Sequence, residues 1–192
     1  MIDVIETAIP GVVVIEPKVF GDCRGYFMES WSQRDFDGKV MPVKFVQDSE
    51  SRSRRGVLRG LHFQKGRAAQ GKLVRVVEGT VMDVAVDIRR GSPTFGKYVM
   101  VELSGENHRQ VFLPRGFAHG FVVLSETALF QYKCDSPYAP EAEGSIAWDD
   151  PELGIEWPVP EGGLILSERD KAAPRLKDAG ELFDYAIDYY AE

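Results

Sequence analysis

Apolar residues fall in short runs along the middle of the chain, and polar turn residues separate these runs. Runs rich in Val, Ile, Phe and Tyr that end at Gly, Pro, Asn or Ser are typical of β-strands. We expect strands at residues 9–15, 45–47, 72–77, 81–88, 98–103, 110–113, 120–123 and 128–132. Their short, even spacing favours an antiparallel sandwich or barrel over alternating strands and helices.

Helical patterns are sparse along the chain. Residues 30–36 begin at a serine that can cap one or two helical turns, and residues 181–190 are compatible with a terminal helix. Residues 136–160 contain five prolines, which is typical of an ordered loop. Since there is no internal repeat and no linker composition, the pattern predicts a single all-β domain over residues 1–192 with a few short helices.

The composition is that of an ordinary globular protein. Of 192 residues, 44% are hydrophobic and 28% are charged, which argues against a disordered or fibrous chain. The first residues carry acids where a signal peptide needs positive charge, and no stretch approaches the ~18 apolar residues of a membrane span. Cys23 and Cys134 are too few for a disulfide scaffold, so we expect a cytoplasmic protein with reduced thiols.

The charge is unevenly distributed. The formal net charge is −7, but residues 51–75 contain eight Lys and Arg and no Asp or Glu, so the remaining residues sum to −15. The basic residues are interleaved with apolar ones, four glycines and His62, which is unlike a simple solvated face. We expect a pocket for a phosphate-bearing small molecule. An acidic chain is a poor general nucleic-acid binder, and we expect neither nucleic acid nor a membrane as partner.

The three histidines differ in their surroundings. His108 lies in a polar turn, and we expect it to be exposed and without function. His119 ends a Pro-x-Gly-x-x-His pattern that resembles the second motif of the cupin superfamily of β-barrels. It is either an inward functional residue or a core histidine satisfied by a neighbour.

His62 stands where the first cupin motif would fall. Metal-binding cupins place a second histidine two residues later and then a Glu, whereas this chain has Gln64 and no acid before Glu78. Two of the four usual ligands are missing, so we expect a barrel without metal. His62 is then free to act as a general base near neutral pH.

A histidine base is often oriented by a carboxylate, which also stabilises the imidazolium. Asp170 and Asp83 are both candidates, and the residues alone do not choose between them. Asp83 lies among apolar neighbours, where an unpaired carboxylate would be costly. Along the strand at 128–132, Phe130 and Tyr132 point to one face while Leu129 and Gln131 point to the other. Tyr132 is either an inward phenol or a packed core residue.

Five segments of the chain together resemble the dTDP-4-dehydrorhamnose 3,5-epimerase family. They are Asp-Cys-Arg-Gly-Tyr-Phe at 22–27, the stretch 47–64 with Arg-Gly-Leu-His-Phe-Gln at its end, Pro-Arg-Gly-Phe-Ala-His-Gly-Phe at 114–121, Ile-Ala-Trp-Asp-Asp-Pro at 146–151 and Leu-Ser-Glu-Arg-Asp at 166–170. The segments follow in order at compatible spacing over nearly the whole chain, and as a set they are highly specific.

The resemblance implies a metal-free jelly roll of the cupin type that uses no cofactor. It also implies a homodimer whose subunits exchange an N-terminal strand. The implied activity is epimerisation of dTDP-4-dehydro-6-deoxy-D-glucose at C3 and C5 to give dTDP-4-dehydro-L-rhamnose, a step of dTDP-L-rhamnose and polysaccharide biosynthesis.

The resemblance also assigns roles to residues. It implies that His62 is the general base and Asp170 its orienting carboxylate. Tyr132 would be the acid on the opposite face, and Lys72 the cation that stabilises the enolate oxygen. The positions assigned to binding the nucleotide sugar are Arg24, Phe27, Glu29, Gln47, Ser49, Arg59, Lys72, His119, Tyr138, Glu143 and Arg169. The side chains expected to stack on thymine are Phe20, Phe27 and Tyr138.

Two positions depart from the family pattern. Ser49 stands where the family usually has Asn, so a polar contact to the substrate becomes shorter or passes through water. Arg169 stands where the family usually has Lys, which keeps the charge but changes the donor geometry.

The chemistry of the implied reaction accounts for these residue types. A 4-ketone acidifies the C3 and C5 protons, and the enolate formed on removing either proton needs a fixed cation. Inversion then requires a proton donor opposite the base. The alternatives are a mono-epimerase acting at C3 or C5 only, a ketoisomerase, a non-catalytic nucleotide-sugar-binding cupin and a metal-dependent cupin oxygenase. The combined base and acid argue against the pure binder, and the missing ligands argue against the oxygenase.

Overall fold

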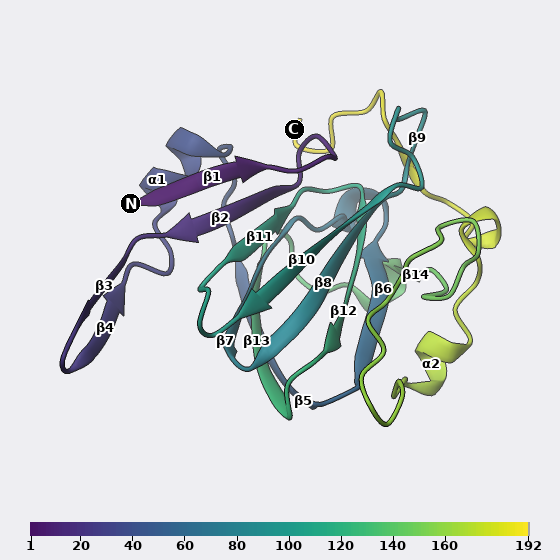
Figure 1. Ribbon diagram of the computed structural model, residues 1–192. Coiled ribbons are helices and arrows are strands. Elements are labelled where there is room, and N and C mark those ends of the chain that lie inside the picture. Colours follow the sequence, from purple (N-terminus) through teal and green to yellow (C-terminus); the bar gives the residue numbers. More distant parts are fainter. Residues whose placement is uncertain (192) are drawn as a thin grey trace.

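Two antiparallel sheets face each other in the computed structural model, which describes residues 1–191 (Figure 1). The first sheet has the order β1 (Ile2–Glu6), β2 (Val13–Pro17), β11 (Gln110–Leu113), β7 (Lys72–Glu78), β13 (Thr127–Cys134) and β5 (Gln47–Arg54). The second has the order β10 (Tyr98–Ser104), β8 (Thr80–Asp87), β12 (Phe117–Val123), β6 (Leu58–Gln64) and β14 (Glu143–Ser145). The predicted all-β sandwich is confirmed.

The remaining elements are short. Two pairs of strands form small separate sheets, namely β3 (Val19–Asp22) with β4 (Gly25–Met28) and β9 (Arg89–Arg90) with β15 (Phe183–Asp184). The α-helices are α1 (Gln33–Lys39) and α2 (Glu168–Lys171), and 3-10 turns cover Gly66–Ala68, Pro140–Ala142 and Leu176–Asp178. Within residues 1–191, no helix is long and apolar enough to cross a membrane.

Alternation along the strands fills the space between the two sheets. Val74 on β7 and Phe130 on β13 point inward and meet Phe121 from β12. The rings of Phe121 and Phe130 are stacked with their centroids 4.2 Å apart. Burial of an apolar side chain of this size contributes about 1.5–3 kcal/mol to the free energy of unfolding, so this cluster fixes how the sheets pack.

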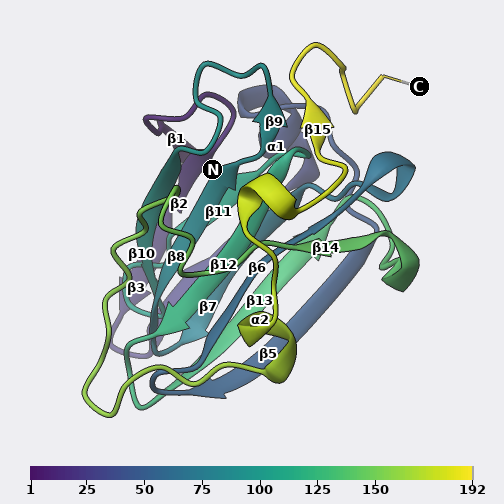
Figure 2. The ribbon, with the colours of Figure 1, turned by 90° about the vertical axis from the view of Figure 1, so that its right-hand side faces the viewer.

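The outer face of the second sheet is covered by the chain after β14. Ile146, Trp157 and Phe183 from this segment pack on Leu58 and Leu61 of β6. Figure 2 shows α2 and the C-terminal segment lying across this sheet. The proline-rich stretch 136–160 is therefore ordered, as predicted, because its apolar side chains complete a second core.

The first sheet is covered on its outer face around α1. Ser32 caps the helix, since its Oγ accepts a hydrogen bond from the Asp35 amide at 3.4 Å. Phe36 is buried, and its ring lies 5.1 Å from that of Phe112 in the sheet. The helix predicted at 30–36 is therefore present, but it begins later and ends at Lys39.

Strands β6 and β12 approach unusually closely at Gly60. A Cβ at this position would lie 2.5 Å from the Gly120 Cα and 2.8 Å from the His119 carbonyl oxygen, and the Gly60 φ is +129°. Both facts require glycine. His62 lies opposite His119 in the strand register, and the register is irregular between His119 and Phe121, beside this close approach. Directly opposed residues share one face of a sheet.

Strands β3 and β4 form a hairpin that projects away from both sheets (Figure 1). Its aromatic side chains face solvent, with exposed fractions of 55% for Phe20, 57% for Tyr26 and 70% for Phe27. Three exposed aromatic rings on one small hairpin are unusual for a surface that stays in water.

Three expectations from the sequence are corrected. The terminal helix at 181–190 is wrong, because β15 pairs in parallel with β9 and turns follow it. The strand expected at 9–15 begins only at Val13, since a turn with a Val12 amide to Ile9 carbonyl hydrogen bond precedes it. His108 is half-buried rather than exposed, because its ring packs 4.7 Å from that of Tyr26.

Candidate active site

A polar cavity of about 300 Å³ opens at one end of the space between the sheets. His62 reaches it from β6, and strands of the facing sheet supply the opposite wall. The cavity is lined by His62, Lys72, Tyr132, Gln47, Ser49 and Cys134 together with Phe63, Gln64, Gln70, Tyr138 and Glu143. Besides His62, six of the residues that the sequence assigned to catalysis or substrate binding therefore border this one cavity.

His62 is paired with Asp170. Its Nε2 lies 2.6 Å from the Asp170 Oδ1, and the second carboxylate oxygen accepts a 2.8 Å hydrogen bond from Ser167 Oγ. Because an ionised carboxylate only accepts, this contact places the hydrogen on Nε2 and the lone pair of the neutral ring on Nδ1. The geometry is that of a histidine base held by a carboxylate.

Asp170 is buried, yet its pKa is lowered. Burial alone raises this pKa, and the hydrogen bonds from His62 and Ser167 and the charge of Arg169 outweigh it. The carboxylate is therefore charged at neutral pH and stabilises a protonated His62. Ser167 also caps α2, since its Oγ accepts from the Asp170 amide at 3.1 Å.

Asp83, the other carboxylate considered for His62, is paired elsewhere. Its Oδ1 lies 2.7 Å from His119 Nε2, and both side chains are almost completely buried. The His119 ring packs 6.0 Å from that of Phe130. This arrangement is that of a core histidine satisfied by a neighbour, so a substrate contact by His119 stays a prediction.

Tyr132 and Lys72 lie side by side in the wall opposite His62. The Lys72 Nζ is 5.9 Å from the centroid of the Tyr132 ring. Burial lowers the pKa of the Lys72 ammonium, and the nearby groups Cys134, Asp83 and Glu143 partly offset this. Burial raises the pKa of the Cys134 thiol to about 11, so this thiol is neutral at pH 7.

A chain of polar contacts follows the rim of the cavity. Gln47 Nε2 donates to Ser49 Oγ at 3.0 Å, and Gln47 Oε1 accepts from the Tyr138 amide at 3.0 Å. The Tyr138 hydroxyl donates to Glu143 at 2.9 Å. Glu143 also pairs with Arg169 at 2.6 Å, and although burial raises its pKa, this pair and the Tyr138 bond lower it overall. The rim therefore connects β5 to α2, next to Asp170.

A second hollow of about 330 Å³ borders His62 on its other side. It is lined by Arg59, Ser167, Arg169 and Asp170 among others. The Arg59 Nε donates to Ser53 Oγ at 3.2 Å. His62 thus stands between a cavity with Tyr132 and Lys72 and a hollow with two guanidinium groups, which suits an anionic group attached to a reacting ring.

The expected residues of the β3–β4 region are not brought to His62 within one chain. Arg24 pairs with Asp22 at the tip of the hairpin, and Glu29 accepts from the Met1 ammonium at 3.0 Å. Phe27 lines a shallow hollow made by the hairpin itself. Arg24, Phe27 and Glu29 therefore lie apart from the cavity in the described chain.

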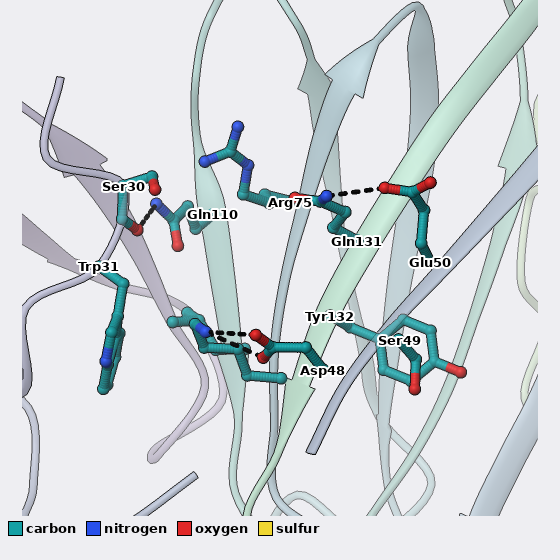
Figure 3. Close-up of a pocket in the computed structure, with 11 residues that line it drawn as sticks. Ser30, Trp31, Asp48, Ser49, Glu50, Arg75, Gln110, Gln131 and Tyr132 are labelled. Carbon is teal, nitrogen blue, oxygen red and sulfur yellow. Dashed lines mark hydrogen bonds and ion pairs between the residues drawn. The ribbon is translucent and has the colours of Figure 1, made fainter. Parts of the chain in front are cut away.

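A third hollow of about 490 Å³ lies along the outer face of the first sheet (Figure 3). Four of its polar side chains are already paired with one another. Lys133 donates to Asp48 at 2.9 Å, and Gln131 donates to Glu50 at 2.7 Å. This hollow shares only Tyr132 and Ser49, at its edge, with the His62 cavity.

Sequence reasoning missed Ser167, although a signal was present. Ser-x-x-Asp at 167–170 is the spacing of a helix cap, and it places the serine hydroxyl beside the Asp170 carboxylate.

Within residues 1–191, no three His, Cys, Asp or Glu side chains gather as metal ligands do.

Comparison with known proteins identifies relatives over almost the whole chain. The family model described as dTDP-4-dehydrorhamnose 3,5-epimerase matches residues 6–178. The dTDP-4-dehydrorhamnose 3,5-epimerase of Salmonella typhimurium is 57% identical over 183 residues, which cover 93% of this chain and 98% of that protein. The protein of the same name from Pseudomonas aeruginosa is 59% identical over 173 residues, covering 90% and 94%.

A solved structure agrees with this relationship. The crystal structure of dTDP-6-deoxy-D-glucose-3,5-epimerase from Legionella pneumophila, in complex with dTDP-4-keto-L-rhamnose, superposes with a TM-score of 0.93. It is 51% identical and covers 97% of this chain and 100% of its own. Since a family model, curated relatives and a solved structure agree over most of the chain, this chain belongs to the dTDP-4-dehydrorhamnose 3,5-epimerase family.

Proposed function

We propose that His62 and Tyr132 are the opposed base and acid with which this chain carries out the reaction of its family. The chain is an epimerase of the isomerase class, and it converts dTDP-4-dehydro-6-deoxy-D-glucose to dTDP-4-dehydro-L-rhamnose for rhamnose biosynthesis. The observation that carries the assignment is the His62–Asp170 pair on a cavity whose other wall holds Tyr132 and Lys72.

The base and the acid have distinct tasks. The lone pair of His62 takes the proton from C3 or C5, and Asp170 stabilises the imidazolium that forms. Lys72 stabilises the negative charge that collects on the C4 oxygen of the enolate. Tyr132 then delivers a proton from the opposite face, which inverts the carbon.

Binding of the nucleotide sugar uses groups on both sides of His62. Arg59 and Arg169 border the hollow that accepts the diphosphate, where a guanidinium makes paired contacts with phosphate oxygens. Gln47, Ser49, Tyr138 and Glu143 hold the sugar and the base of the nucleotide from the rim. Because Arg169 is paired with Glu143 before binding, the diphosphate competes with this carboxylate for the guanidinium. A contact from His119 rests on the family pattern alone, because its ring is bonded to Asp83 and borders neither hollow.

Deuterium incorporation tests this function directly. The chain is incubated with dTDP-4-dehydro-6-deoxy-D-glucose in deuterated water, and we expect label at both C3 and C5 by NMR. Label at one carbon only would make the chain a mono-epimerase, and a moved carbonyl would make it a ketoisomerase. Tight binding of the nucleotide sugar without any label would leave a non-catalytic binding protein.

We infer further that the active form is a homodimer in which the β3–β4 hairpin of one subunit completes the cavity of the other. The support is the position of Arg24, Phe27 and Glu29, which the family pattern assigns to nucleotide-sugar binding but which lie away from His62 in their own chain. The exposed rings of Phe20 and Phe27 suit stacking on thymine once a partner covers them.

Mixed dimers test the exchange of hairpins. His62→Ala and Arg24→Ala subunits are each expected to be nearly inactive alone, because one lacks the base and the other an arginine for the diphosphate. When the two are co-expressed, half of the dimers pair unlike subunits, and each of these has one site with both groups intact, which restores about a quarter of wild-type activity. Activity no higher than that of the two variants measured separately would place each hairpin in its own chain's site.

We also infer that the protein works in the cytoplasm, as one domain over residues 1–192 and with neither metal nor cofactor. The support is chemical: the reaction moves protons only, and His62, Tyr132 and Lys72 supply every group that it needs. Cys23 and Cys134 are both free thiols, which suits a reducing compartment.

A further inference from the structure

The C-terminal segment returns to the barrel and contacts the turn that leads into β12. The Tyr190 hydroxyl accepts a 3.0 Å hydrogen bond from the Arg115 amide. Arg115 in turn donates from Nη1 to the Tyr189 carbonyl at 2.8 Å, and its guanidinium lies 4.8 Å from the Tyr190 ring centroid. The segment is therefore fixed at its end by specific contacts rather than by apolar packing alone.

These contacts meet at a buried carboxylate, Asp135, which the reaction does not use. Its side chain is only 2% exposed. The carboxylate accepts from Arg115 Nε at 3.1 Å and from the Gly71 amide at 2.8 Å. The Tyr190 hydroxyl and the Asp135 carboxylate both lie against the Gly71 backbone. The Asp135 amide donates to the Gly71 carbonyl at 3.2 Å. Asp135 therefore holds both polar groups of the Gly71 backbone.

Gly71 is enclosed by the same two side chains. A Cβ at this position would lie 2.6 Å from the Tyr190 hydroxyl oxygen and 2.7 Å from Asp135 Oδ2. The next residue is Lys72, which begins β7 and lies opposite Cys134 in the strand register. The position of this backbone decides where the Lys72 side chain enters the cavity.

We propose that Tyr190 and Asp135 are positioning residues for Lys72, and that the C-terminal segment thereby aims the ammonium group at the substrate. This inference rests on the role proposed above for Lys72. Neither residue lines the His62 cavity. Asp135 acts through its two hydrogen bonds to the Gly71 backbone, and Tyr190 acts through its hydroxyl, which lies against Gly71. A misplacement of about 1 Å at a reacting group can cost ~10²-fold in rate, which makes such support worthwhile.

A double-mutant cycle between Tyr190 and Lys72 tests the proposal. Tyr190→Phe keeps the ring and removes the hydroxyl, and we expect kcat for inversion to fall about tenfold with little change in KM. Lys72→Met alone is expected to lower kcat ~10²–10³-fold. If Tyr190 acts through Lys72, adding Tyr190→Phe to Lys72→Met causes no further loss.

Two further variants make the result specific. Tyr189→Phe is the matched control, since this hydroxyl accepts only from the Asp184 amide at 2.9 Å, and we expect it to keep the wild-type kcat. Asp135→Asn keeps the shape and one acceptor, and it should reproduce the pattern of Tyr190→Phe. All variants are assayed well below the lowest of their unfolding midpoints.

The outcomes separate the inference from the function it rests on. The inference is overturned if Tyr190→Phe leaves kcat unchanged, or if it lowers kcat by the same factor in the wild-type and Lys72→Met backgrounds. The second result would give the segment a structural role only. Full activity of Lys72→Met by itself would instead overturn the role proposed for Lys72.

Discussion

Replacing His62 by Ala is expected to abolish epimerisation and the entry of deuterium at both C3 and C5. One residue serves both carbons, because the cavity presents a single histidine held by a carboxylate. Loss of a general base costs about 10²–10⁴-fold, and here each turnover needs the base twice. The measurement is the rate of label entry at each carbon, followed by NMR in deuterated water.

The control for His62→Ala is a histidine that lies elsewhere. His108→Asn removes an imidazole from a turn, and Asn tolerates the left-handed backbone there, where φ is +56°. This variant should exchange at the wild-type rate. Survival of exchange at either carbon in His62→Ala would show that another group removes that proton.

Tyr132→Phe is expected to separate proton exchange from inversion. His62 still removes the proton and Lys72 still stabilises the enolate, so label continues to enter from the face of the base. The donor on the opposite face is missing, so inversion falls by about 10²–10⁴-fold. The ring itself keeps its packing beside Phe130, whose centroid is 6.2 Å away. Recovered sugar should therefore be labelled but largely of unchanged configuration.

A second tyrosine variant controls for the loss of a hydroxyl group. The Tyr98 hydroxyl donates only to the Gly154 carbonyl at 3.3 Å, away from the cavity, and Tyr98→Phe should invert both carbons normally. If Tyr132→Phe inverted at the wild-type rate, the acid would be another residue. Equal loss of exchange and inversion would mean that Tyr132 is needed before the proton is removed.

Strands with regular alternation could be predicted from the sequence, and interrupted ones could not. β7 and β11 were expected almost at their observed bounds, because apolar and polar residues alternate or run together there. β6 was not predicted because Gly60 interrupts its apolar pattern. Glycine is needed at this position because β12 approaches closely there. At the C-terminus, separate tertiary contacts of Tyr189 and Tyr190 outweigh the weak helical pattern.

The members of the site were readable from motifs, but their pairing was not. Asp83 and Asp170 were equal candidates from residue type, and only the fold shows that one faces His119 and the other His62. Pairings across strands and across a cap depend on register and on long-range packing, which a local pattern does not contain. The family resemblance supplied Asp170 because it carries that three-dimensional information indirectly.

The pair His62–Asp170 joins residues 108 positions apart, and Asp170 lies on the segment that covers the second sheet. During synthesis, the strands of both sheets leave the ribosome before that segment exists. The nascent chain therefore holds an uncovered apolar sheet face and an unpartnered base until the segment after β14 has emerged. Activity and protection from aggregation therefore arrive together, once this segment has emerged, and chaperones that shield nascent chains are most needed before that point.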